Sequence, residues 1–490
     1  MLPEIVLTSQ LTERLRKVFG DRLGVYHSRY TDAERVEVYR KQISDTPYDI
    51  IVGVRSSVLL PFHNLGMVII DEEHETSFKQ TEPAPRYHAR NVALVMARMS
   101  GAKTLLGTAT PSLESYSNAV AGKYGYVSLT TRFGNVCMPE IEVVDIAELK
   151  RKKLMNGPFS PVLLREIRQA LERKEQIILF QNRRGFAPVV ECHVCGWTPQ
   201  CPHCDVSLTF HKRSNSLTCH YCGFSTSVAQ RCPQCDADRL SSKGYGTERI
   251  EDVLASIFPD ARVARMDLDT TRSRSAYEGI IKGFQHGDTD ILIGTQMVTK
   301  GLDFRRVSVV GILNASTMLN QPDFRSYERA YQMMTQVAGR AGRSSAGNGQ
   351  NVRPGRVILQ VHDAKQPTVM QVVRGDFEGM FRTQMEERRL FMYPPLCRLV
   401  YVYIKHKDEI VLEHLAEELA ALLRQVFGHR VLGPGMPPIA RVQTMYIRKV
   451  CLKLELTANM AEARRRLHEI QKYMTSKPEY KSAVMYYDVD

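Results

Sequence analysis

Eight cysteines, grouped in four Cys-x-x-Cys pairs, limit what this chain can fold into more than any other feature. They are Cys192, Cys195, Cys201, Cys204, Cys219, Cys222, Cys232 and Cys235. A Cys-x-x-Cys pair on a tight turn points two sulfurs at one metal ion, and two such pairs complete a tetrahedral site. The spacing therefore predicts two zinc ions in closed structural sites with no open position for catalysis. The sequence by itself leaves open which pairs share an ion.

The nearby histidines are interpreted as bystanders, because eight sulfurs already fill two zinc shells. They are His193, His203, His211 and His220. A secreted disulfide domain is the alternative, but the first ten residues lack a signal-type apolar core. Paired thiols suit a reducing compartment, so we expect a cytoplasmic protein. The three remaining cysteines are read as ordinary thiols: Cys137, Cys397 and Cys451.

Length and charge narrow the class of protein further. A chain of 490 residues is long enough for about three domains. The formal net charge of +13 favours a polyanionic partner such as nucleic acid. Since no apolar run approaches the roughly 20 residues that a bilayer requires, we expect no membrane association.

Short continuous apolar runs recur through much of the chain, each followed by small or charged residues and a helical pattern. The runs are Glu4–Leu7, Ile50–Val54, Met67–Ile70, Thr104–Leu106, Ile177–Phe180, Ile291–Ile293 and Val307–Leu313. Strands buried on both faces have this pattern, so the sequence predicts an α/β fold with parallel sheets covered by helices. Ligands of such sheets bind at the carboxyl ends of the strands.

Two segments depart from this pattern. Residues 191–243 are rich in Cys, His and Pro and are interpreted as a zinc module inserted into a host domain. Residues 366–490 predict a small α+β domain of alternating elements. Its expected strands and helices are Leu396–Lys405, Glu409–Val426, strands around a turn in Val442–Leu456, Ala461–Met474 and Ser482–Tyr487.

An acidic pair follows one of the apolar runs. Asp71 and Glu72 end the run that begins at Met67. A carboxylate at a strand end can hold Mg²⁺, and its neighbour can polarise the water that attacks a γ-phosphate. The competing interpretation is a surface acidic turn. The small hydroxyl residues of Leu106–Ser112 suit a loop that touches the pair, or an ordinary turn that caps a helix.

Two later motifs have the same kind of chemistry. In Gln296–Phe304, backbone amides around Gly301 suit phosphate, and Asp303 suits ribose or the acidic pair. In Tyr331–Arg343, three side chains fall at helical spacing and are expected on one face: Gln336, Arg340 and Arg343. Guanidinium groups aimed at a cleft can stabilise charge on a phosphoryl group in transfer.

Taken in order, these motifs resemble those of superfamily 2 helicases. With the eight-cysteine insertion, the chain resembles the primosomal replication-restart helicases, the PriA family. Further matches are Leu2–Thr8, Asn182–Phe186, Gly246–Glu248 and Asp488–Asp490. The resemblance implies two RecA-like lobes, the first incomplete, with ATP and Mg²⁺ as ligands. The expected domains are 1–130 for lobe 1, 131–190 and 244–365 for lobe 2, 191–243 for the zinc insertion and 366–490 for the C-terminal domain.

The resemblance also implies roles for single residues. Asp71 and Glu72 would serve magnesium and water activation, and Gly301 and Asp303 would couple the second lobe. Gln336, Arg340 and Arg343 would sense the γ-phosphate. One zinc ion would take Cys192, Cys195, Cys232 and Cys235, and the other Cys201, Cys204, Cys219 and Cys222. An aromatic-rich loop would meet single-stranded DNA through Phe78, Lys79, Arg86, Tyr87 and Arg90.

The family's activity is ATP-driven 3′→5′ unwinding at stalled or repaired forks and primosome assembly. Implied partners are single-stranded and forked DNA, single-strand-binding protein and other primosome components, and we expect a monomer. However, the sequence contains no Gly-x-x-x-x-Gly-Lys-Thr phosphate loop, and Leu302 stands where the family often has His. We therefore expect a truncated or mis-started chain with little ATPase activity of its own.

Two rival functions are a non-enzymatic zinc scaffold for DNA or protein partners and a different superfamily 2 translocase. The missing phosphate loop favours the scaffold, whereas the acidic pair and the arginine motif disfavour it. The eight-cysteine insertion disfavours the other translocase.

Overall fold

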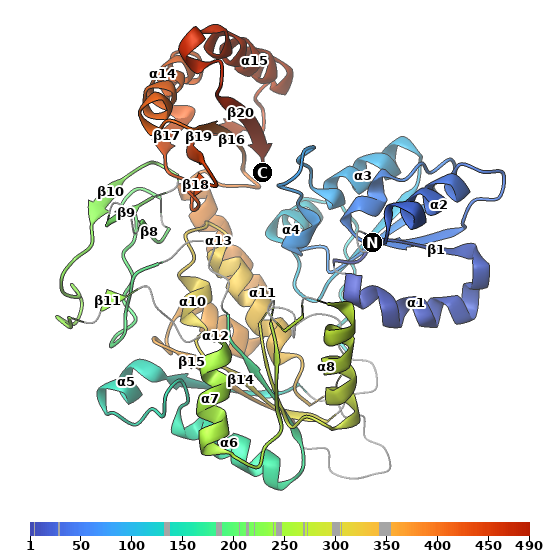
Figure 1. The fold of residues 1–490 in the computed structure, drawn as a ribbon, viewed down its shortest axis with the longest axis vertical. Coiled ribbons are helices and arrows are strands. Elements are labelled where there is room, and N and C mark those ends of the chain that lie inside the picture. Colours follow the sequence, from blue (N-terminus) through green and yellow to red (C-terminus); the bar gives the residue numbers. More distant parts are fainter. Residues whose placement is uncertain are drawn as a thin grey trace. The chain divides into compact units, whose positions relative to one another are not determined.

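The structure is a computed structural model. It describes residues 1–3, 5–27, 30–131, 138–182, 189–204, 206–211, 215–219, 221–238, 240–241, 247–267, 270–271, 273–295, 304, 306–342 and 354–490. The chain divides into two compact units, unit 1 within Met1–Tyr126 and unit 2 within Val127–Asp490 (Figure 1).

Unit 1 holds two pairs of parallel strands with helices between them. Strand β1 pairs with β2, and β3 pairs with β4. Met1 and Leu2 lie between β2 and β3, since the Leu2 amide donates to Gly53 O and Met1 O accepts from the Asp71 amide. The elements are α1 Ile5–Phe19, β1 Leu23–Tyr26, α2 Asp32–Gln42, β2 Ile50–Gly53, β3 Met67–Asp71, α3 Ala89–Met99, β4 Lys103–Gly107 and α4 Leu113–Val120.

The prediction of a strand at Glu4–Leu7 is wrong, because α1 begins at Ile5. A short apolar run does not distinguish a strand from a buried helix. Leu11, Leu15 and Phe19 continue the run at a spacing of four residues and pack against Leu2 and Leu23. The helical periodicity further along the chain therefore decides the conformation.

A six-stranded sheet forms the centre of unit 2, in the order β12-β13-β6-β14-β15-β5. All five of its strand pairs are parallel, as the apolar runs predict. Its strands are β5 Glu140–Asp145, β6 Gln176–Phe180, β12 Val263–Met266, β13 Ile291–Gly294, β14 Val307–Ile312 and β15 Arg356–Val361. Helices α6 and α7 bury one face. The helices of this part of unit 2 include α5 Ile146–Arg151, α6 Pro161–Glu172, α7 Thr247–Ile257, α8 Arg274–His286, α10 Ser316–Leu319 and α11 Ser326–Ala338.

Local sequence explains how α6 reaches the sheet. Ser160 caps its first turn by accepting from the Leu163 amide, and Pro161 follows at the first helical position. A Cβ on Gly311 of β14 would lie 2.9 Å from the Leu163 side chain. The absence of a side chain at Gly311 therefore allows this close approach of helix and sheet.

The zinc module consists of short strands and turns. Strand β7 (Glu191–Cys192) pairs with β11 (Leu240–Ser241). A separate antiparallel sheet has the order β10-β9-β8. Its strands are β8 Thr209–His211, β9 Ser216–Thr218 and β10 Ser225–Ser227. Buried cysteines and Tyr221 share an apolar cluster with residues of the C-terminal domain.

The C-terminal domain is an antiparallel sheet, order β17-β19-β16-β20, with β18 paired to β19. Two helices, α14 and α15, contribute to one apolar core with this sheet (Figure 1). The predicted strands and helices are confirmed. They are β16 Cys397–His406, α14 Glu409–Phe427, β18 Arg441–Val442, β19 Met445–Glu455, α15 Met460–Ser476 and β20 Val484–Val489. The sheet also contains β17 Val431–Gly435, a strand that the sequence pattern does not predict.

Two further helices, α12 (Pro367–Arg374) and α13 (Phe377–Leu390), precede that sheet. Within the described part of the chain, no helix is both long and apolar enough to span a membrane.

Candidate functional site

The acidic pair lies at the carboxyl end of β3, beside the end of β4. Asp71 is exposed, and its Oδ1 accepts a hydrogen bond from the Glu72 amide at 3.0 Å. Glu72 has a φ of 48°, a left-handed conformation that costs a non-glycine residue roughly 1–2 kcal/mol. Such a conformation persists where neighbouring contacts hold it. Because Asp71 and Glu72 lie at the carboxyl end of β3, the structure places two carboxylates at the edge where a parallel sheet binds ligands.

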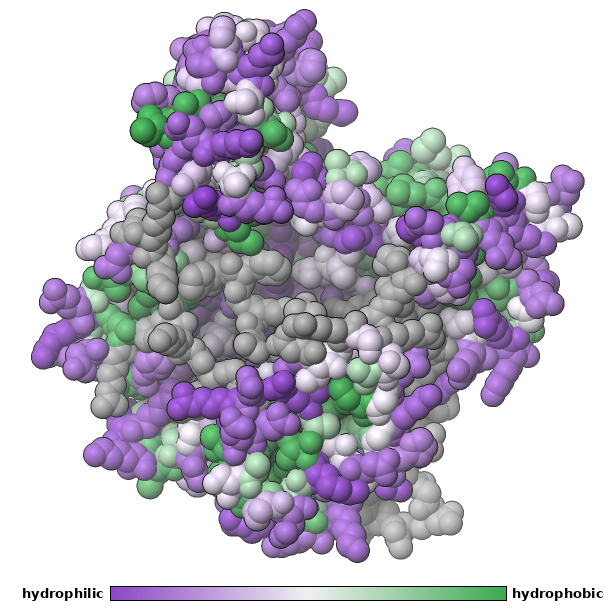
Figure 2. Space-filling view, in the orientation of Figure 1, coloured by the Kyte–Doolittle hydropathy of each residue, from purple (hydrophilic) through white to green (hydrophobic). Residues whose placement is uncertain are grey.

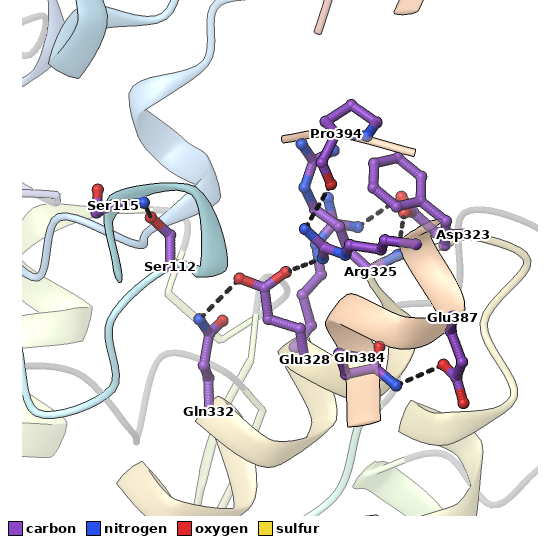
Figure 3. Close-up of polar contacts among 12 residues, drawn as sticks. Ser112, Ser115, Asp323, Arg325, Glu328, Gln332, Gln384, Glu387 and Pro394 are labelled. Atoms are coloured by element: carbon purple, nitrogen blue, oxygen red, sulfur yellow. Dashed lines mark hydrogen bonds and ion pairs between the residues drawn. The ribbon is translucent and has the colours of Figure 1, made fainter. Parts of the chain in front are cut away.

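Glu73 supplies those contacts, and the sequence interpretation missed it. Its side chain is fully buried and accepts from the Ser112 amide at 2.7 Å and the Ser115 hydroxyl at 2.8 Å. Arg90 Nη1 donates to its Oε2 at 2.6 Å and to Ser112 Oγ at 2.7 Å. Figure 3 shows Ser112 and Ser115 joined by the hydrogen bond that caps α4. Glu73 therefore ties the turn after β3 to α3 and α4.

The loop after β4 contacts the acidic turn. Thr108 Oγ1 lies 2.7 Å from His74 Nδ1, and Gly107 O accepts from the Glu73 amide at 3.2 Å. Ser112 also caps α4. The interpretation as a turn that caps a helix is confirmed. The loop contacts Glu73 and His74, and its contact with the pair Asp71 and Glu72 stays a prediction.

Two of the five predicted DNA contacts are wrong for this fold. Phe78 is fully buried in a cluster with Ile70 and Ala93, so its ring offers no face to a base. Arg90 is buried in its ion pair with Glu73. In the sequence, Phe78 and Arg90 resemble residues of a nucleic-acid-binding surface. In the folded unit 1 both side chains are buried.

The other three predicted contacts stay a prediction. Lys79, Arg86 and Tyr87 are partly exposed, and Arg86 pairs with Glu82 at 2.9 Å. Burial raises the pKa of Tyr87, so its ring is neutral at physiological pH.

The arginine motif is only partly helical. Gln336 lies in α11, but the helix ends at Ala338 and Gly339 caps it. The Arg340 amide donates to Val337 O at 3.0 Å, a tighter turn than an α-helix. The expected single helical face is therefore wrong for Arg340, because α11 ends at Ala338, two residues before it. The predictions for Gly301, Asp303 and Arg343 lie outside the described residues.

The eight cysteines form two groups of four sulfurs. One group is Cys192, Cys195, Cys232 and Cys235, and the other is Cys201, Cys204, Cys219 and Cys222; within each, the sulfurs lie within 4.8 Å of one another. In three cases, two sulfurs from different Cys-x-x-Cys pairs of one group lie 3.6 Å apart. Zn–S bonds of about 2.3 Å in a tetrahedron separate sulfurs by about 3.8 Å. The residues therefore fit two zinc ions in the nested arrangement.

Comparison with known protein families gives four matches along the chain. Residues 1–119 match a DEAD/DEAH box helicase model, and residues 245–345 match a helicase conserved C-terminal domain. Residues 201–226 match the PriA DNA helicase Cys-rich region domain. Residues 389–490 match a primosomal protein N C-terminal domain.

Several relatives that match most of the chain are named replication restart protein PriA. Replication restart protein PriA of Bacillus subtilis is 40% identical over 96% of this chain and 57% of the relative. The protein of the same name in Rickettsia felis is 33% identical over 94% of this chain and 69% of the relative. The chain belongs to the PriA replication restart family. It spans little more than half the length of its B. subtilis and Synechocystis PriA relatives, 57% and 54%.

Membership of the PriA family accounts for the combination of helicase-like sheets and a cysteine module. It confirms the α/β fold with two RecA-like lobes, a zinc module and a C-terminal domain. It also disfavours the two rival interpretations, the zinc scaffold and the unrelated translocase.

Proposed function

We propose that this chain functions in replication restart as part of a DNA helicase. Its activity is ATP-dependent 3′→5′ unwinding at stalled or recombination-repaired forks, followed by primosome assembly. The observation that carries the proposal is the acidic pair at the end of β3, anchored by Glu73 in a member of the PriA family.

The residues divide the chemistry of phosphoryl transfer among them. Asp71 is exposed at a strand end, where its oxygens suit a hard cation such as Mg²⁺. Glu72, held by the Glu73 anchor, orients the attacking water. Gln336, Arg340 and Arg343 stabilise charge on the γ-phosphate, and Gly301 and Asp303 couple the second lobe to the nucleotide. The bound ATP supplies the phosphoryl group, with Mg²⁺ neutralising its charge.

The 490-residue chain by itself is proposed to bind DNA but to hydrolyse ATP at background rates. A phosphate loop provides the amide cradle and the lysine that hold the β- and γ-phosphates, and no Gly-x-x-x-x-Gly-Lys-Thr occurs in the sequence. The net charge of +13 suits single-stranded and forked DNA, bound with little base specificity and strong salt dependence. Lys79, Arg86 and Tyr87 are the proposed contacts in unit 1. Single-strand-binding protein and other primosome components are the proposed protein partners.

DNA-stimulated ATP hydrolysis tests the proposal on two proteins. The first is the chain itself, and the second is the chain joined at Met1 to a segment that carries a Gly-x-x-x-x-Gly-Lys-Thr phosphate loop. We expect no turnover from the first and robust turnover from the second. Glu72→Gln in the extended protein should lower turnover by roughly 10²-fold or more.

A matched control separates chemistry from folding. Glu72→Gln removes a partly exposed carboxylate and should leave thermal stability unchanged. If the extended protein binds DNA and two zinc ions but never hydrolyses ATP, the non-enzymatic scaffold is the better function.

A further inference from the structure

Three aromatic rings from different parts of unit 2 meet at the start of α11. Phe324 stacks on Tyr393, with centroids 4.6 Å apart and planes 10° from parallel. Tyr221 meets both rings edge-on, at 6.3 Å from Phe324 and 5.6 Å from Tyr393. All three residues are buried. We call Tyr221, Phe324 and Tyr393 the aromatic joint; its geometry is that of favourable ring pairs.

The aromatic joint is built onto the inner zinc site, the one formed by Cys201, Cys204, Cys219 and Cys222. Tyr221 lies inside the Cys219–Cys222 turn, and its hydroxyl is 3.5 Å from the Phe324 amide. Tyr393 donates its hydroxyl to Cys204 O at 3.0 Å. Both cysteine turns of the inner site therefore contact the joint. The C-terminal domain approaches the same site, since a Cβ on Gly223 would lie 2.8 Å from Pro434 O.

A buried ion pair fixes α11 at the same place. Arg388 Nη2 donates to Glu328 Oε2 at 2.5 Å, and Arg388 Nη1 donates to Pro394 O at 2.8 Å. Both charged side chains are almost fully buried. Figure 3 shows Glu328 and Gln332 on successive turns of α11, with Glu328 Oε1 accepting from Gln332 at 3.4 Å. The first turns of α11 are thus held by α13 and the segment after it.

The outer zinc site, formed by Cys192, Cys195, Cys232 and Cys235, contacts a different part of unit 2. A carboxylate oxygen of Glu191, beside Cys192, lies 3.0 Å from Nδ1 of His362, just after β15. Lys150 of α5 lies 2.9 Å from the other nitrogen of His362. A Cβ on Gly196 would collide with the His362 side chain, so module and sheet edge are in close contact there. The inner zinc site therefore contacts the start of α11, and the outer zinc site contacts the end of β15.

We propose that the inner zinc site, through Tyr221 and Phe324, positions α11 and the turn that carries Arg340. Helix α11 is 13 residues long, about 20 Å of rigid rod, and Arg340 follows its capping glycine. Tyr221, Phe324 and Glu328 are positioning residues that act through α11. Their benefit to ATP hydrolysis rests on the proposed function, but their hold on α11 is a property of unit 2 alone.

Hydrogen–deuterium exchange of the full chain tests this division, with zinc counted in each variant. Cys222→Ser and Cys235→Ser make the same chemical change in the inner and the outer site, and each should release one zinc ion. We expect amide exchange in residues 326–342 to rise about tenfold or more in Cys222→Ser and to stay within about twofold in Cys235→Ser. Exchange in α6 should stay unchanged in both variants.

Variants of Tyr221 keep the test decisive if Cys222→Ser does not fold. Tyr221→Leu retains both zinc ions and should still raise exchange in residues 326–342, whereas Tyr221→Phe keeps the ring and should restore the native rate. Equal exchange in the two cysteine variants would overturn the proposal, as would a rise in α6 that matches the rise in α11. Because the readout involves no ATP, a negative result leaves the proposed helicase function standing.

Discussion

The β3–β4 pair of unit 1 and the six-stranded sheet of unit 2 are both parallel, yet they are covered differently. Ile177, Ile178 and Leu179 of β6 are at most 1% exposed. On β3 and β4, Met67, Ile69 and Leu105 are 51–52% exposed, whereas their neighbours on the opposite face pack against α3. Figure 2 shows further hydrophobic side chains at the surface over α3, where Val95 and Met99 are exposed.

The difference shows that two units with similar strands are stabilised in different ways. Parallel sheets are usually covered on both faces, and packing of this kind dominates unit 2. Unit 1 has an open apolar face near its acidic pair, and the buried Glu73 carboxylate holds that region together through hydrogen bonds. Unit 2 adds two four-cysteine groups to its packing.

Zinc removal should produce the largest difference in stability between the two units. A structural zinc site contributes on the order of 10 kcal/mol to folding, and both sites lie in unit 2. We expect a chelator to increase hydrogen exchange in residues 191–241 and to leave residues 30–126 unchanged. Comparable exchange in both regions after chelation would show that zinc does not stabilise unit 2 selectively.

Glu73→Gln should be the most damaging single substitution in unit 1. Removing one partner of a buried ion pair costs about 3–5 kcal/mol, because Arg90 keeps its charge without a buried counter-ion. The matched control is Glu72→Gln, one residue earlier on a partly exposed side chain, which should cost less than about 0.5 kcal/mol. Denaturation midpoints of unit 1 provide the measurement. Similar midpoints for the two variants would contradict the anchoring role of Glu73.

Two isoleucine substitutions test directly whether each sheet face is buried. Ile177→Ala leaves a cavity in a closed core and should cost about 2–5 kcal/mol. Ile69→Ala makes the same change on the open face of β3 and should cost less than about 1 kcal/mol. Urea unfolding followed by exchange of β6 and β3 reports each loss. If Ile69→Ala is as destabilising as Ile177→Ala, the β3 face is covered in solution.

The smallest expected effect is electrostatic and lies at the start of α11. Burial acts to raise the pKa of Asp323, but Arg329 and Arg325 outweigh it and hold that pKa below its ordinary value. The carboxylate therefore stabilises unit 2 above about pH 4, and this contribution is lost as the pH falls through the folded-state pKa. Asp323→Asn should cost less than about 1 kcal/mol at pH 7 and reduce the acid sensitivity of unfolding. An acid midpoint identical to wild type would show that the ion pair is unimportant.

The sequence predicts where strands lie better than it predicts which strand faces are buried. Continuous apolar runs indicate β6, β13 and β14 correctly, because buried parallel strands need apolar residues on both faces. The same kind of run indicates β3, but it does not show that Met67 and Ile69 lie on an open face. At Ile5 the pattern misleads, since a short run is compatible with a helix. Whether a strand face is covered, and whether a short apolar run forms a strand or a helix, both depend on residues far away in the sequence.

The candidate sites divide in the same way. Cysteine spacing predicts the zinc sites because metal geometry is local. Phe78 and Arg90 look like DNA contacts, but only the folded unit shows that both are buried. Glu73 is one acidic residue among three in sequence, and its role depends on Ser112 and Ser115, about forty residues away. Long-range packing is what the linear pattern lacks.

Native mass spectrometry of the purified chain tests whether two separate four-cysteine sites organise unit 2. We expect two zinc ions per wild-type chain, and one each in Cys222→Ser and Cys235→Ser. A folded chain without metal, or a single substitution that releases both ions while the fold remains intact, would contradict this expectation.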